Sequence, residues 1–126
     1  MCTSPTDGDS GEPREQSGES DGPRVPVYRV IDAVELAYLR ANGDYGPNPN
    51  GSGKYFALTL LGARAFAAHP INAGRTITET TVPQSILSFG TNIIEPGPNS
   101  PGPSVHFDEP ELAAVYRAMT RVRIVR

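Results

Sequence analysis

Cysteine, tryptophan and long apolar runs are nearly missing from this sequence of 126 residues. Its single cysteine, Cys2, rules out an internal disulfide and a cysteine-based metal site. No apolar run approaches the roughly 18 residues of a membrane-spanning helix, and the N-terminus lacks the basic and apolar regions of a secretory signal. We therefore expect a protein without a membrane segment that is cytoplasmic, or is delivered as a secreted effector without a classical signal peptide.

Apolar side chains are also scarce in the first 24 residues, where only Met1 and Cys2 carry one. Such a segment cannot bury enough apolar surface to offset its lost chain entropy, so we predict that residues 1–24 are a disordered, acidic, Gly/Pro/Ser-rich tail. The tail has a net charge of −4, which leaves +1 for residues 25–126 because the whole chain carries −3. A nearly neutral remainder without a broad basic face gives no strong nucleic-acid signal.

The remaining residues alternate between short strand and helix patterns. Asp32 is predicted to cap the first helix together with Glu35 in a capping box, and Asn42-Gly43 is predicted to end that helix. Thr59 is predicted to cap the second helix. Loops rich in glycine, proline and asparagine are expected at 44–53 and 95–103. The predicted strands are 25–31, 55–58, 75–82, 104–107 and 120–125, and the predicted helices are 32–43, 60–68 and 110–119, with 84–89 either continuing a strand or forming a turn of helix.

This order lacks the regular rhythm of about 30 residues that βαβ units impose. We therefore predict one α+β domain over residues 25–126, with a mostly antiparallel sheet and short helices. The two long loops are expected to carry function, because long loops on a rigid scaffold commonly do so.

One segment is more specific than the rest. Gly53 and Lys54 precede the apolar strand Tyr55-Phe56-Ala57, and an alanine-rich helix follows that contains Phe66. This arrangement resembles the second signature of the ADP-ribosyltransferase superfamily, in its polymerase-like and bacterial-toxin branches, where a second aromatic residue follows the tyrosine by eleven positions. Tyr55 and Phe66 have that spacing. Without the resemblance, both would also be consistent with ordinary core aromatics.

The resemblance implies a small split antiparallel sheet that binds NAD as a substrate, with Tyr55 and Phe66 sandwiching the nicotinamide ring. Stacking of this kind contributes about 0.5–1.5 kcal/mol per aromatic pair. It also implies that Arg29, which follows Tyr28 on the first strand, anchors the NAD, with Tyr28 beside it.

The third signature of the family is a glutamate on a late strand, and the matching strand 104–107 contains none. Glu109 and Glu79 are the candidates for the catalytic acid, and the sequence ranks them equally. A second departure is Ala63, where the polymerase-like branch has a serine.

Small chains of this kind resemble the toxin modules of bacterial polymorphic toxins, which implies a cognate immunity protein and a macromolecular acceptor of unknown identity. Two other functions stay open. One is a metal-independent ribonuclease that uses His106 with Arg29 or the C-terminal arginines, and the other is a catalytically degenerate binding module of the same fold. The two histidines lack zinc-ligand spacing, so no metal is expected.

Overall fold

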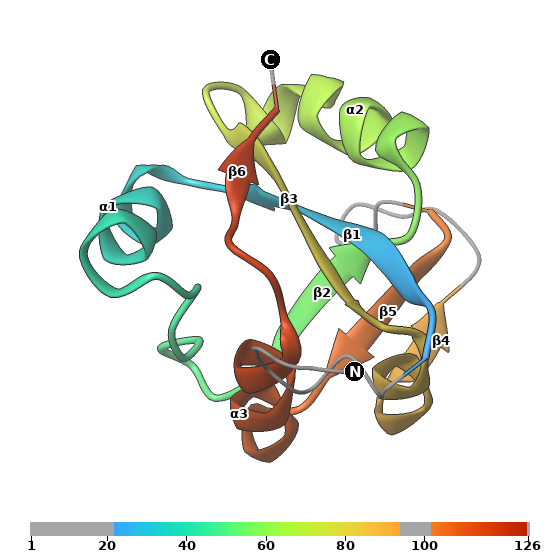
Figure 1. The fold of residues 1–126 in the computed structure, drawn as a ribbon. Coiled ribbons are helices and arrows are strands. Elements are labelled where there is room, and N and C mark those ends of the chain that lie inside the picture. The colour runs from blue at the N-terminus through green and yellow to red at the C-terminus, as the bar shows by residue number, and fades with distance from the viewer. Residues whose placement is uncertain (1–21, 94–101, 126) are drawn as a thin grey trace, which may run out of the picture.

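The computed structural model describes residues 22–93 and 102–125 of the chain. Helices and strands are interleaved, so the α+β class is confirmed (Figure 1). One short strand, Thr91–Ile93, was not predicted from the sequence. The predicted tail (residues 1–24) and the loop 95–103 lie largely outside the described residues. The elements are β1 (Arg24–Ile31), α1 (Ala33–Asn42), β2 (Lys54–Ala57), α2 (Leu60–Ala68), η2 (Pro70–Asn72), β3 (Thr76–Pro83), η3 (Gln84–Phe89), β4 (Thr91–Ile93), β5 (Ser104–Phe107), α3 (Glu109–Ala118) and β6 (Arg123–Ile124).

The described strands form one sheet in the order β4-β5-β2-β1-β3-β6, and every neighbouring pair is antiparallel. β1 pairs with β3 along its whole length, from Arg24 opposite Pro83 to Ile31 opposite Thr76. Between β1 and β2 the register contains one pair, Tyr28 opposite Ala57. Figure 1 shows β2 and β5 running across β1 and β3. The sheet is therefore nearly divided between β1 and β2.

The helix ends follow the capping residues of the sequence. Asp32 caps α1 by accepting a hydrogen bond from the backbone N–H of Glu35 at 2.9 Å, and Gly43 ends the helix at a φ of 86°. Thr59 caps α2 through the N–H of Gly62 at 3.0 Å. The predicted second half of the α1 capping box is wrong, because the Glu35 side chain instead binds Arg29 and Lys54.

The C-terminal strand is shorter than the alternating pattern predicts. β6 contains only Arg123 and Ile124, which pair with Glu79 and Thr78 of β3. Upstream of β6, Thr120 bonds to β3 through its side chain, which accepts from the N–H of Thr81 at 3.0 Å. The backbone N–H of Thr120 also donates to the carbonyl of Thr81 at 3.0 Å, so this residue stays attached to β3 although the regular pairing contains only Arg123 and Ile124.

Side chains of the sheet divide between two faces. The α3 face carries the larger core, in which Phe56, Phe107 and Ile31 are almost completely buried and pack with residues of α1 and α3. The α2 face carries a smaller cluster that contains Tyr28, Ala57 and, from α2, Ala63. Because successive residues of a strand point to opposite faces, Phe56 and its neighbours Tyr55 and Ala57 serve different cores.

Candidate functional site

A cavity of about 480 Å³ lies where β1 and β2 separate. Residues on both sides of the split and in the 44–53 loop line it, together with the segment that connects α2 to β3. The lining residues are Tyr28, Arg29, Val30, Asn48, Asn50, Ser52, Gly53, Lys54, Tyr55, Ala57, Phe66, Ile71, Asn72 and Arg75. All four predicted cofactor-binding residues are among them, and the two predicted catalytic acids are not.

The aromatic residues of this site share the α2 face. Tyr28 stands opposite Ala57 in the register, and Ala57 is two residues from Tyr55, so both tyrosines project to the same side of the sheet. Phe66 comes from α2, which covers that side. The Tyr55 ring also contacts His106 of β5, with 4.5 Å between ring centroids. The three strands that the sequence analysis compared with family signatures are therefore neighbours, in the sheet order β5-β2-β1.

Arg29 occupies the split itself rather than the aromatic side of the cavity. Its Nε and Nη2 donate to the two carboxylate oxygens of Glu35 at 2.5 and 2.9 Å, and its Nη1 donates to the carbonyl of Tyr55 at 2.9 Å. The guanidinium carbon lies 5.9 Å from the ring centroid of Phe56, on the α3 face. Arg29 thus bridges β1 and β2 and forms the floor of the cavity, with its charge neutralised by Glu35.

Lys54 and Glu35 are the parts of this site that sequence reasoning missed. The Lys54 side chain is 3% exposed, and its Nζ lies 3.2 Å from the carboxylate of Glu35 and 3.2 Å from the carbonyl of Tyr45. Burial lowers the pKa of Lys54, and the charge of Arg29 lowers it further, while Glu35 opposes both effects. One carboxylate therefore serves two cations. The Gly53-Lys54 pair was visible in the sequence, but no sequence pattern linked it to Glu35.

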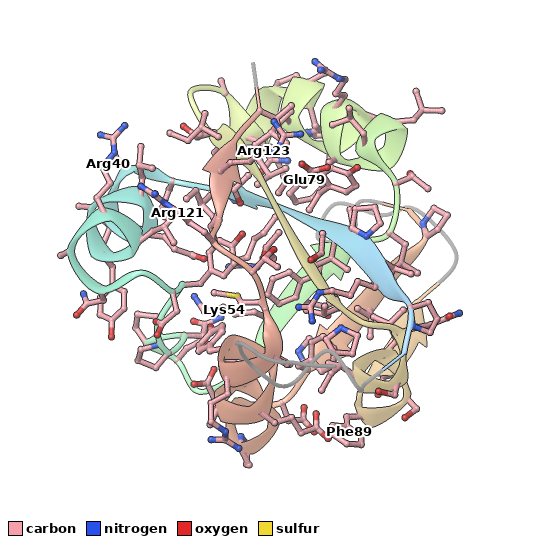
Figure 2. All side chains as sticks on the ribbon, in the orientation of Figure 1. Arg40, Lys54, Glu79, Phe89, Arg121 and Arg123 are labelled. Atoms are coloured by element: carbon pink, nitrogen blue, oxygen red, sulfur yellow. The ribbon has the colours of Figure 1, made fainter. Side chains whose placement is uncertain are left out.

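Glu79 lies on the α2 face, outside the cavity lining. Both Nε and Nη2 of Arg123 contact its carboxylate. In Figure 2, Glu79 and Arg123 lie side by side beneath α2, while Lys54 lies apart from them, towards α1 and α3. The pKa of Tyr28 is raised mainly by burial and also by a hydrogen bond to Glu79. The Glu79 carboxylate is thus occupied by the cation of β6 and the phenol of β1.

Glu109 organises the 44–53 loop. Its carboxylate accepts hydrogen bonds from the backbone N–H groups of Asn48, at 3.1 and 3.3 Å, and of Gly53, at 3.0 Å. Gly53 has a φ of 77°, and a Cβ there would lie 2.1 Å from the carbonyl oxygen of Phe107, so only glycine fits. The side chain of Asn48 also donates to the carbonyl of Gly53 at 2.8 Å. Glu109 therefore holds the polar rim of the cavity without lining the cavity itself.

His106 is tied to the same loop. Its Nε2 lies 2.6 Å from the carbonyl of Ser52, and its Nδ1 lies 3.6 Å from the carboxylate of Asp108. Because a carbonyl only accepts, Nε2 must carry the proton of this hydrogen bond. His106 shares the α2 face with Tyr55, whereas the guanidinium of Arg29 is held by Glu35 on the other face. Both ring nitrogens of His106 therefore face groups of the loop and of the segment after β5, and the ribonuclease alternative, with Arg29 or the C-terminal arginines as its second residue, stays a prediction.

Comparisons with known proteins do not add a family to this geometry. No protein-family model, curated protein or solved structure matches the chain. Within residues 22–93 and 102–125, no helix is long and apolar enough to cross a membrane. The same residues contain no group of three or more His, Cys, Asp or Glu side chains that could hold a metal ion.

Proposed function

We propose that this chain is an NAD-binding domain of the ADP-ribosyltransferase type. The observation that carries the proposal is the cavity at the split of the sheet, because Tyr55 and Phe66 line it from a strand and from the next helix. A planar nicotinamide ring could stack against these two side chains, and Tyr28 adds a phenol on the same face. The volume of about 480 Å³ lies within the usual range for small-molecule sites.

Cleavage of the nicotinamide–ribose bond is the second part of the proposal. In the family that the sequence resembles, a glutamate stabilises the ribose during this step. Among the described residues, no Asp or Glu lines the cavity. The two candidate acids are bound elsewhere, Glu79 to Arg123 and Glu109 to backbone amides. This arrangement favours the degenerate binding module over a fast transferase, so we expect NAD to bind and nicotinamide to be released slowly.

Titration of the full chain with NAD tests both parts in one sample. If NAD is present at ten times its dissociation constant, mass action stabilises the folded state by about 1.4 kcal/mol, or about 6 °C in melting temperature for a domain of this size. Chromatography of the same samples measures the nicotinamide released. Unchanged melting at millimolar NAD would contradict NAD binding.

Tyr55→Ala supplies the matched test of the stacking role. We expect the variant to fold, because Tyr55 is only half-buried, and to lose most of the NAD-dependent shift in melting temperature. Phe89→Ala is the control, since Phe89 is an exposed aromatic residue of η3 that does not line the cavity. A Tyr55→Ala variant with the wild-type shift would remove Tyr55 from the site.

A further inference from the structure

Positively charged side chains outnumber negatively charged ones around the cavity. Three cationic residues line it, Arg29, Lys54 and Arg75, and no carboxylate does so among the described residues. Glu35, which lies behind the floor, neutralises one of these positive charges. The cavity therefore favours an anionic ligand, because a positive excess remains after this pairing.

Two of the three cations are already occupied. Arg29 donates to both oxygens of Glu35 and to the carbonyl of Tyr55. Lys54 is buried, and its Nζ lies within 3.2 Å of Glu35 and of the carbonyl of Tyr45. A phosphate that approached either side chain would have to compete with these contacts.

Arg75 is different, because it is exposed at the rim and has no ion-pair partner among residues 22–93 and 102–125. Its position is nevertheless well defined. The backbone N–H of Arg75 donates to the carbonyl of Asn72 at 3.2 Å, and the buried Asn72 side chain donates to the carbonyl of Phe66 at 2.8 Å. These two hydrogen bonds, which share Asn72, hold the backbone of Arg75 near Phe66, one of the two aromatic residues of the proposed nicotinamide site.

We propose that Arg75 is the phosphate-binding residue of this cavity, so that the cavity binds a phosphorylated nicotinamide nucleotide more tightly than the nucleoside without phosphate. The inference rests on the proposed function. If the nicotinamide ring lies against Phe66, the phosphate attached to its ribose can reach the edge of the cavity where Arg75 lies. A guanidinium suits this role because its planar fork donates two parallel hydrogen bonds to phosphate oxygens. Arg29, which the sequence resemblance predicts to anchor the NAD, lies at the floor of the cavity with its charge paired to Glu35.

Calorimetric titration with a series of ligands tests the inference on the full chain. Nicotinamide riboside has no phosphate, nicotinamide mononucleotide has one, NAD has a diphosphate, and ADP-ribose has a diphosphate but no nicotinamide. We expect Arg75→Ala to weaken binding of the three phosphorylated ligands about tenfold and to leave the riboside unchanged. Arg75→Lys should fall between the two, because it keeps the charge and loses the fork.

Arg40→Ala is the control, since Arg40 is an exposed arginine of α1 (Figure 2) that does not line the cavity. Equal NAD affinity for wild type and Arg75→Ala would overturn the phosphate role while leaving NAD binding intact. A different result would separate the two proposals. If ADP-ribose binds in an Arg75-dependent way and nicotinamide riboside does not bind at all, the phosphate role of Arg75 is supported and the nicotinamide site is overturned. No binding of any of the four ligands to wild type would overturn both.

Discussion

The two faces of the sheet use the same strands for different purposes. On the α3 face, Phe56 and Phe107 are closed off by α1 and α3, and their rings meet edge to face with centroids 5.9 Å apart. On the α2 face, a single helix covers a smaller cluster, and the space beside it stays open as the cavity. Lys54 and Tyr55, adjacent in sequence, thus belong to a buried charge cluster and to the aromatic side of the cavity respectively.

This comparison shows how a small domain can support an open site. The α3 face supplies the apolar burial that stabilises the fold, at roughly 25 cal/mol per Å² of apolar surface. Because that face is complete, the α2 face can leave aromatic side chains partly exposed. The buried ion cluster at the split lets β1 and β2 diverge, since Arg29 joins the strands where their register ends.

The largest expected effect is a difference in stability between variants of Phe56, on the α3 face, and of Tyr55, on the α2 face. Phe56→Ala should lower the free energy of unfolding by about 4 kcal/mol, because it empties a fully buried site. Tyr55→Ala should lower it by only about 1 kcal/mol, because Tyr55 is half-buried. Urea denaturation followed by circular dichroism measures both values, with Phe89→Ala as the exposed control. Equal losses for Phe56→Ala and Tyr55→Ala would mean that both faces carry the fold equally.

A smaller effect tests the ion cluster at the split. Glu35→Gln should lower the free energy of unfolding by about 3 kcal/mol, because Arg29 and Lys54 lose their shared carboxylate while remaining largely buried. The double variant Glu35→Gln/Lys54→Met removes one charge of each sign and should be more stable than Glu35→Gln alone. Wild-type stability in Glu35→Gln would show that the cluster contributes nothing to joining β1 and β2.

The smallest effect concerns the phenol of Tyr116, which donates to the carbonyl of Gly46 at 2.5 Å. Tyr116→Phe should cost about 1 kcal/mol at pH 8 through loss of this hydrogen bond. Burial raises the pKa of Tyr116, so the folded state holds the proton more tightly than the unfolded state, whose tyrosine pKa is about 10. The stabilising contribution is therefore complete below pH 10 and is lost as the pH rises further.

The difference in stability between wild type and Tyr116→Phe should accordingly shrink and then reverse above pH 10. The lowered pKa of Lys54 has the opposite sign and makes the fold more stable as the pH rises, but it is common to both proteins and cancels in the difference. Tyr38→Phe is the control, since Tyr38 is exposed on α1. A difference that stays constant from pH 8 to pH 11 would show that Tyr116 ionises equally in both states.

The local elements were predictable because their signals are local. Asp32, Gly43 and Thr59 cap their helices where the sequence places them, since a cap needs only a suitable side chain or a positive φ a few residues away. The shortening of β6 was not predictable, because the alternating pattern of residues 120–125 does not show which of them pair regularly with β3, about 40 positions away in the chain.

The candidate site was predictable in part. The spacing of Tyr55 and Phe66 placed both on one cavity, since a strand and the helix that follows it pack together. The roles of Glu35 and Glu109 were not predictable. Glu35 was predicted to complete a helix cap and instead holds two cations, and Glu109, one of two candidates for the catalytic acid, binds backbone amides of the 44–53 loop. In both cases the partner lies on another element.

Except for β4, which no pattern predicted, the sequence by itself determined the order of strands and helices, together with the caps at Asp32, Gly43 and Thr59 and the alternation that separates Tyr55 from Phe56, because these depend on neighbours along the chain. Only the tertiary structure decided which charges meet. It brought Glu35 between Arg29 and Lys54, Glu79 against Arg123, and left Arg75 at the rim. Electrostatic pairing acts through space between groups far apart in the chain. Strand register places Glu79 opposite Arg123, and the packing of α1 against the sheet places Glu35 beside Arg29 and Lys54.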